Sequence, residues 1–104
     1  MKMAPLIICA SLALLGCRRG PCPPDTELRG GPQARQQSCE YQDSNGMSVK
    51  HGPFVEWDAD GRKRVEGSYR HGQQEGHWSY WDESGRKTIE REYHDGAVVT
   101  EVKP

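Results

Sequence analysis

The sequence predicts an all-β protein, an antiparallel meander of stacked β-hairpins preceded by a disulfide-stapled loop. Two observations predict it. A unit that begins at Gly52 is written again from Gly76 without a gap, and the chain after Cys39 consists of short aromatic and β-branched runs separated by glycines. Helical periodicity is absent from that region. With 104 residues and 34% hydrophobic content, the chain has room for one small domain without a deep catalytic pocket.

The N-terminus is typical of an export signal, with Lys2 followed by an apolar run from Ala4 to Leu15. The run is shorter than the roughly 20 residues that a membrane-spanning helix needs. It ends in Leu14-Leu15-Gly16-Cys17, which resembles the lipobox of bacterial lipoproteins. This resemblance implies that residues 1–16 are cleaved and that the Cys17 thiol is acylated. An ordinary secretory signal with a chance cysteine is the alternative.

The lipoprotein resemblance also implies a location. Two or three acyl chains hold a protein on a membrane far better than one chain does. In such lipoproteins an Asp after the acylated cysteine favours the inner membrane, and here the position is Arg18. We therefore expect a lipid-anchored protein of the bacterial cell envelope, at the outer membrane if the host has one.

Two cysteines remain once Cys9 is removed with the signal and Cys17 is acylated. Cys22 and Cys39 in an exported chain most simply form one disulfide, worth about 3 kcal/mol in the chain-entropy model. A zinc site is the alternative, although there is no second close cysteine pair. Residues 17–38 are thus predicted as an acylated N-terminus, tether and stapled loop, and residues 39–104 as the repeat domain.

Nine identities at one constant offset define the repeat. Gly52, Trp57, Asp58, Gly61, Arg62, Lys63, Glu66, Tyr69 and Gly72 recur as Gly76, Trp81, Asp82, Gly85, Arg86, Lys87, Glu90, Tyr93 and Gly96. The full repeats cover about residues 52–75 and 76–99. A weaker half-unit, from Tyr41 to Phe54, precedes them.

Each repeat contains two turn signals. Residues 58–61 and 82–85 are predicted as type I turns that end in a left-handed glycine, and residues 70–72 and 94–96 mark the opposite ends of the hairpins. The runs between them, residues 53–57, 63–69, 77–81, 87–93 and 97–102, have the length and composition of strands. In the second run Val65, Gly67 and Tyr69 share one face.

The two units resemble the bacterial variant of the MORN repeat (membrane occupation and recognition nexus). Its pattern is Gly-x-Trp-x-x-Trp-Tyr/Asp-x-x-Gly-x-x, then Tyr-x-x-Gly. The first unit carries it from Gly52 to Gly72, with Phe54 in place of the first Trp, and the second from Gly76 to Gly96. The resemblance, over about residues 41–102, implies an elongated sheet of stacked hairpins and does not imply an enzyme. Some relatives are antitoxin components, a role hard to reconcile with an exported, acylated chain.

The aromatic residues are expected to form the core of the repeats, with some of them available as a binding face: Phe54, Trp57, Tyr69, Trp78, Tyr80, Trp81 and Tyr93. The turn glycines of the same units are Gly52, Gly61, Gly72, Gly76, Gly85 and Gly96. The Gly-x-aromatic-x-x-Trp spacing puts two rings on opposite sides of a regular strand. One ring of each repeat is thus exposed unless a bulge turns it inward.

Charged residues near the turns allow two interpretations each. Residues 62–64 and 86–87 could form a basic ridge that touches lipid head groups, but neighbouring acidic residues favour a salt-bridged turn. His71, His77 and His94 with Asp95 could ligate a metal, but surface turn residues are the default interpretation, so we expect neither a metal nor a cofactor. A net charge of −1 argues against nucleic-acid binding.

No catalytic motif is present, so an enzyme is not expected. The expected function is a membrane-anchored envelope lipoprotein that displays a repeat module for binding an envelope protein. Free sheet edges would also allow self-association. Binding of cell-wall glycan through exposed Trp residues is the alternative, and binding of lipid head groups through the basic ridge is a third.

Overall fold

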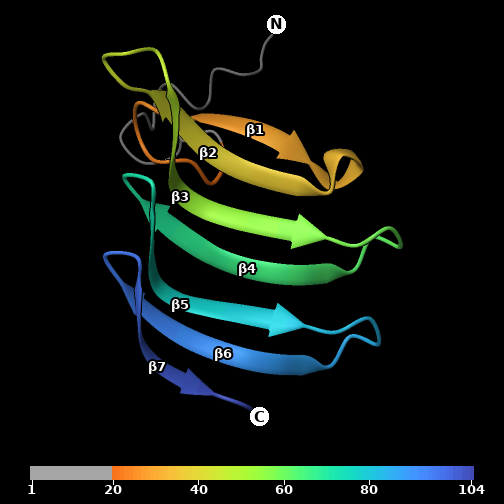
Figure 1. Cartoon of the computed structure of the whole chain (residues 1–104). Coiled ribbons are helices and arrows are strands. Elements are labelled where there is room, and N and C mark those ends of the chain that lie inside the picture. Colours follow the sequence, from red (N-terminus) through yellow and green to blue (C-terminus); the bar gives the residue numbers. More distant parts are fainter. Residues whose placement is uncertain (1–19) are drawn as a thin grey trace, which may run out of the picture.

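The structure, a computed structural model, describes residues 20–104 and confirms the all-β meander (Figure 1). Its seven antiparallel strands pair in sequence order in one sheet. The strands are β1 (Glu27–Gly31), β2 (Gln36–Gln42), β3 (Ser48–Trp57), β4 (Lys63–Arg70), β5 (Gln73–Trp81), β6 (Lys87–His94) and β7 (Ala97–Val102), with a 3-10 helix η1 (Pro32–Ala34) between β1 and β2. Within residues 20–104, no helix has the length and apolar character to cross a membrane.

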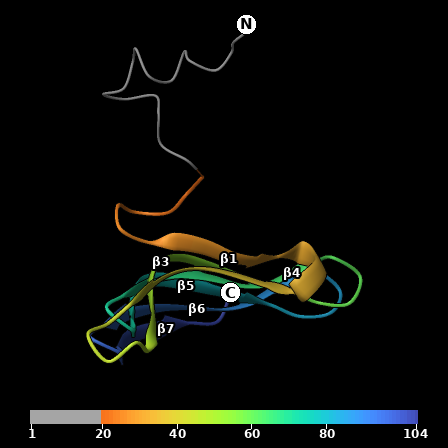
Figure 2. The same cartoon turned by 90° about the horizontal axis from the view of Figure 1, so that it is seen from above.

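The sequence repeat is also a repeat of strand pairing. Every residue pair between β3 and β4 recurs one repeat later between β5 and β6, so that Phe54 faces Gly67 and Trp78 faces Arg91. The bulge between the last two pairs recurs as well, at Trp57 and at Trp81. Seen from above in Figure 2, the strands lie over one another, so the array extends along the direction in which hairpins are added.

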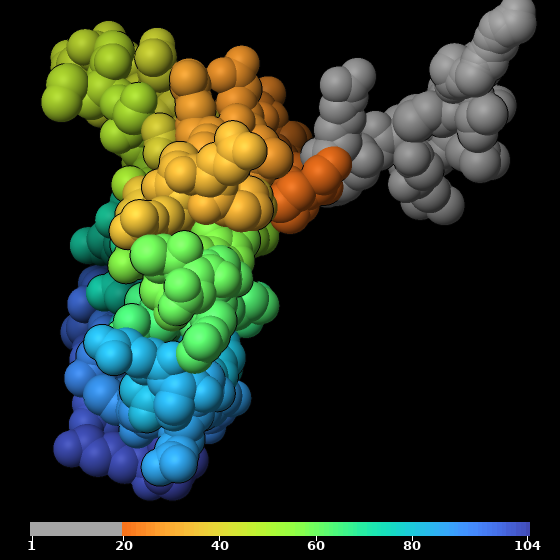
Figure 3. Space-filling model, turned by 90° about the vertical axis from the view of Figure 1, so that its right-hand side faces the viewer, coloured from red at the N-terminus to blue at the C-terminus, as the bar shows by residue number. Residues whose placement is uncertain are grey.

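The predicted turns are confirmed at one end of the hairpins. The amide of Gly61 donates to the carbonyl of Asp58 at 3.0 Å, and Gly85 and Asp82 repeat this bond. Both glycines are left-handed, with φ of 85° and 90°. Figure 3 shows the ends of the β1–β2, β3–β4 and β5–β6 hairpins lying one above the next.

At the other end, the β4–β5 and β6–β7 turns have two residues each, and both residues of each turn are left-handed. His71 and Gly72 have φ of 46° and 87°, and Asp95 and Gly96 have φ of 49° and 87°. Two consecutive left-handed residues are typical of a type I′ turn, whose twist matches that of the flanking strands. A non-glycine residue in this conformation is uncommon, so His71 and Asp95 require local support.

The sequence prediction is wrong for part of the segment assigned to a tether and loop. Residues 27–31 and 36–38 belong to β1 and β2, so a predicted boundary at residue 39 falls inside a strand. The side chains of β1 are almost all exposed, and the strand is held by backbone pairing with β2. Such a strand lacks the hydrophobic alternation that a sequence pattern can detect.

The predicted disulfide between Cys22 and Cys39 is confirmed, with the two Cα atoms 5.5 Å apart. It fixes the segment before β1 against the sheet, where Cys39 is 1% exposed. Gly52 provides the space for this segment, because a Cβ there would lie 2.7 Å from Cδ of Pro23. The prediction of Gly52 and Gly76 as turn glycines is wrong, because they lie inside β3 and β5. Gly52 has a φ of 117°, which a side chain would strain.

Five of the seven rings expected in the core gather on one side of the sheet, which we call the core face. Phe54, Trp78 and Tyr93 are buried there, and Tyr69, Tyr80 and Val65 pack against them. The Trp78 ring lies at the centre, with centroids 5.2 Å from Tyr69, 5.6 Å from Phe54 and 5.9 Å from Tyr93. Such tilted and edge-on pairs stabilise a core beyond simple area burial.

Trp78 can be buried because the residue of β4 beneath its ring, Gly67, has no side chain. A Cβ on Gly67 would lie 2.1 Å from Cδ2 of the Trp78 indole, so the ring rests directly on the backbone. The indole N–H donates to the carbonyl of Ser68 at 3.0 Å. The pairing of β4 with β5 shifts at this place, between Glu66 and Ser68. Close approach explains this glycine, since its φ is not among the positive values.

We expect Gly67→Ala to lower the free energy of unfolding by about 1–3 kcal/mol, the usual cost of overpacking, because the added methyl group must displace the Trp78 ring. Urea unfolding measures the change. The control is Gly61→Asn, at a left-handed position with open space around it, where asparagine is tolerated and the loss should stay below about 1 kcal/mol. Equal midpoints for Gly67→Ala and the parent protein would contradict this packing.

Candidate functional site

Trp57 and Trp81 lie on the other side of the sheet, which we call the outer face. Each is three residues after a core ring in the same strand, and strand alternation places it on the opposite side. The expectation that one ring of each repeat lies outside the core is therefore confirmed. Both rings are half-buried rather than fully exposed. A bulge lies beside each of these two tryptophans, but it does not turn the ring toward the core face.

Lysine side chains cover the Trp81 ring. The Nζ atoms of Lys63 and Lys87 lie 6.0 and 5.5 Å from its centroid. Lys63 stands opposite Trp57 in the sheet, and Lys87 stands opposite Trp81. Tryptophan and lysine thus alternate from β3 to β6, and cation–π contacts of this kind stabilise an exposed ring by about 0.5–1 kcal/mol.

Four of the five basic residues of the expected ridge contact acceptors, and the two lysines among them confirm the salt-bridged interpretation at their positions. Lys63 and Lys87 contact Glu66 and Glu90 at 3.2 and 2.7 Å. Arg64 Nε donates to the carbonyl of Trp81 at 2.6 Å. In addition, Arg62 donates to the carbonyl of Glu83, which joins neighbouring hairpin ends. Glutamates therefore accompany the positive charges of Lys63 and Lys87 on this ridge.

Aspartates organise the turns beneath this ridge. The Asp58 carboxylate accepts the amides of Asp60 and Arg62, and the bond from Arg62 lowers the pKa of the Asp58 carboxyl group. Asp82 has the same arrangement, and its pKa is lowered first by the hydroxyl of Ser84. These carboxylates serve the backbone of the turns.

The three histidines considered as metal ligands do not come together. His77 lies 2.8 Å from Glu92, and His94 lies 3.2 Å from Glu75. His71 contacts Tyr41 and His51 instead. The correspondence of residues 71 and 95 in the repeat places them in equivalent turns, not in one site.

Glu75, His94 and Asp95 are the one group in residues 20–104 with ligand atoms close enough to hold a metal ion, all within 4.8 Å. Their atoms already have partners. His94 Nδ1 and Nε2 lie 3.2 and 3.3 Å from Glu75 and Asp95, and Arg70 lies 3.6 Å from Asp95. The His94 imidazole thus lies between two carboxylates of neighbouring elements, each within ion-pair distance of one of its ring nitrogens.

A second cluster, His51, His71 and Tyr41, was missed by sequence reasoning. The two imidazole centroids are 4.3 Å apart, and the Tyr41 ring lies 5.8 Å from each of them. The residues come from β3, the β4–β5 turn and β2, so only the register of three strands brings them together. They line a cavity of about 390 Å³ with Pro24, Asp25, Thr26 and Gln42.

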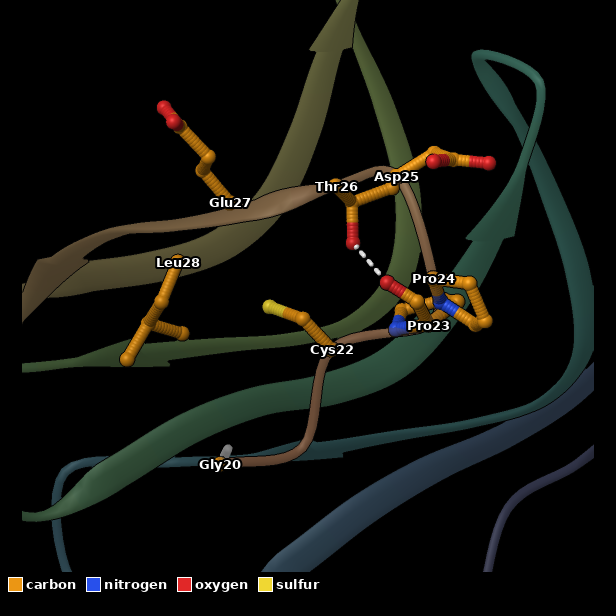
Figure 4. Close-up of a pocket in the computed structure, with 8 residues that line it drawn as sticks. All are labelled: Gly20, Cys22, Pro23, Pro24, Asp25, Thr26, Glu27 and Leu28. Atoms are coloured by element: carbon orange, nitrogen blue, oxygen red, sulfur yellow. Dashed lines mark hydrogen bonds between the residues drawn. The ribbon is translucent and has the colours of Figure 1, made fainter. Parts of the chain in front are cut away.

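The segment before β1 borders a larger cavity of about 570 Å³, lined by Gly20 and residues 22–28. Figure 4 shows Cys22 and Leu28 on its inner side, with Asp25 and Glu27 pointing away. Thr26 donates to the carbonyl of Pro23 at 2.7 Å, which closes the turn. The lining is mainly apolar and carries no arrangement of groups that would perform catalysis.

The last strand is the most exposed apolar part of the sheet. All residues of β7 are exposed, and its three valines, Val98, Val99 and Val102, are 50%, 62% and 57% exposed. Among residues 20–104, β7 pairs with β6 on one side and with no strand on the other. An unpaired edge of this kind can accept another strand.

Comparison of the chain with protein-family models, with curated proteins and with solved structures gave no match. The predicted lipidation site, Cys17, and the signal in residues 1–16 lie outside the described residues.

We expect Trp78→Ala and Trp81→Ala to differ strongly. The first empties the core and should lower the free energy of unfolding by about 3–5 kcal/mol, whereas the second removes a half-buried ring and should cost less than about 2 kcal/mol. Thermal unfolding followed by circular dichroism measures both. Equal losses would mean that Trp81 is part of the core and that the outer face is not available for binding.

Proposed function

We propose that the protein is a lipoprotein of the bacterial cell envelope that displays its hairpin array as a non-catalytic module for binding another protein. The lipobox-like Leu14-Leu15-Gly16-Cys17 supports the anchor. The resemblance of the repeats to the MORN repeat supports an extended docking surface. In this proposal the acyl chains hold the protein at the membrane, and the array presents its edge and outer face to the partner.

The open edge of β7 is the observation that carries the proposal of protein binding. It combines unpaired backbone groups with the exposed Val98, Val99 and Val102. A partner strand could pair with this backbone and cover the valines, which is the usual form of β-strand addition. The opposite edge is less suitable, because β1 carries the exposed ion pair of Glu27 with Arg29, and charges on an edge strand oppose further pairing.

The outer face favours a second candidate, cell-wall glycan. The half-buried Trp57 and Trp81 rings offer flat surfaces on neighbouring hairpins, and sugars stack on such rings. The lysines over Trp81 and their paired glutamates would supply hydrogen bonds. Protein binding is preferred because lysine side chains already occupy the face of Trp81.

Capture from an envelope extract tests the module. We expect the purified mature protein to retain a specific protein that a variant with a scrambled repeat does not retain. Val99→Lys should reduce this capture at least tenfold by placing a charge on the open edge, and the matched control Val99→Thr should retain it. Both variants should unfold at the same temperature as the parent, since exposed substitutions change stability little.

The same preparations separate the two candidates. If the retained material is peptidoglycan, and if Trp81→Ala abolishes sedimentation with it while Val99→Lys does not, glycan binding replaces protein binding as the function. Failure to retain anything above the scrambled control would contradict the proposal of a binding module.

The anchor predicts the mass of the mature N-terminus. The first residue should be Cys17, carrying the mass of a diacylglyceryl group with or without an amide-linked acyl chain, and Cys17→Ser should leave the protein uncleaved and unacylated. Mass spectrometry of the protein purified from membranes measures both. An unmodified Cys17, or a mature chain that begins elsewhere, would contradict the lipoprotein assignment.

A further inference from the structure

The turn between β4 and β5, residues 70–73, depends on a side chain of the preceding hairpin. The backbone N–H of His71 donates to Nδ1 of His51 at 2.9 Å, and the N–H of Gly72 donates to the carbonyl of Lys50 at 2.8 Å. His71 is the left-handed non-glycine residue of this turn. Since Nδ1 of His51 accepts this hydrogen bond, it carries no proton in this state.

The next repeat contains the same arrangement with a different acceptor. The N–H of Asp95 donates to Oε1 of Glu75 at 2.9 Å, and the N–H of Gly96 donates to the carbonyl of Gln74 at 3.0 Å. His51 and Glu75 are separated by one repeat and occupy equivalent positions. The bond from Asp95 lowers the pKa of Glu75, so this carboxylate stays an acceptor well into the acidic range.

The groups around His51 come from each element packed against it. The His71 ring lies 4.3 Å away between centroids, and the hydroxyl of Tyr41, on β2, lies 2.8 Å from Nδ1 of His71. Arg70 at the end of β4 adds a positive charge, and Asp25, before β1, is the acidic residue lining the shared cavity. On β3 itself, the adjacent residue is Lys50.

We propose that protonation of His51 under mildly acidic conditions releases the β4–β5 turn, whereas the equivalent β6–β7 turn, held by Glu75, stays closed. A proton on Nδ1 converts the acceptor into a donor that faces the His71 N–H, so the hydrogen bond is lost. It also places a positive charge beside Arg70 and against the His71 ring. The turn is a wall of the cavity near Tyr41, so its release opens that cavity.

The direction of the effect follows from the neutral state of His51. Partial burial, the His71 ring and Arg70 all lower the pKa of His51 from its ordinary value of 6.5. The folded chain therefore binds this proton less readily than the unfolded chain. The contribution of His51 to stability is complete above about pH 6.5 and declines as the pH falls below that value.

Amide hydrogen exchange of the mature protein, followed by NMR at about pH 7.5 and about pH 5, tests the inference. The measured quantity is the protection factor of each amide, which corrects for the pH dependence of intrinsic exchange. Protection of the His71 amide should fall about fivefold or more in acid, the size of one neutral hydrogen bond, and protection of the Asp95 amide should not fall. An equal fall at both amides would overturn the proposal.

Reciprocal variants identify the responsible side chain. His51→Glu should abolish the acid-dependent loss at residue 71, and Glu75→His should create such a loss at Asp95. His71→Asn removes the His71 imidazole and keeps a residue that tolerates the left-handed conformation, so the loss should persist in this variant. Persistence of the loss in His51→Glu, or its absence in the parent protein, would overturn the proposal.

Discussion

The contact between the Trp78 indole and the backbone of Gly67 is the constraint on which the rest of the core depends. Trp78 is 1% exposed in a chain with few aliphatic residues, and it contacts the rings of Phe54, Tyr69 and Tyr93. In a single sheet, a ring as large as an indole can be buried against a neighbouring strand only where that strand has no side chain in the way. The missing side chain of Gly67 provides that space, and the indole hydrogen bond to the adjacent backbone fixes the orientation of the ring.

Only the first of the two repeats provides a glycine for such a contact with a ring. Position 67 of the first unit corresponds to Arg91 of the second, whose guanidinium lies 5.2 Å from the Tyr80 ring and 2.7 Å from Glu101. A ring rests on the backbone in the middle of the array, whereas an arginine covers the rings near β7. Likewise the equivalent positions His51 and Glu75 support equivalent turns with acceptors of different chemistry. Units that share a fold thus differ in the side chains that cover their core rings and support their turns.

The sequence predicted what the repeat itself encodes and missed what depends on contacts between hairpins. The strands and turns could be predicted from glycines, aspartates and aromatic residues that recur at a fixed spacing. The positions of the turns then define which residues of β3 and β4 pair. The strand β1 was missed because its side chains carry no hydrophobic pattern. The partnership of His51 with His71 was missed because the two residues are 20 positions apart and meet only through the register of β3 and β4. For the same reason Gly67, which is not a turn glycine, gave no signal of its role.

One NMR measurement tests the central contact most directly: the chemical shifts of the Gly67 α protons, together with their nuclear Overhauser contacts to the indole of Trp78. A ring resting on this backbone predicts a strong upfield shift of at least one α proton and direct contacts to the indole protons. Ordinary glycine shifts without such contacts would contradict the packing of Trp78, and with it the aromatic core that joins the two repeats.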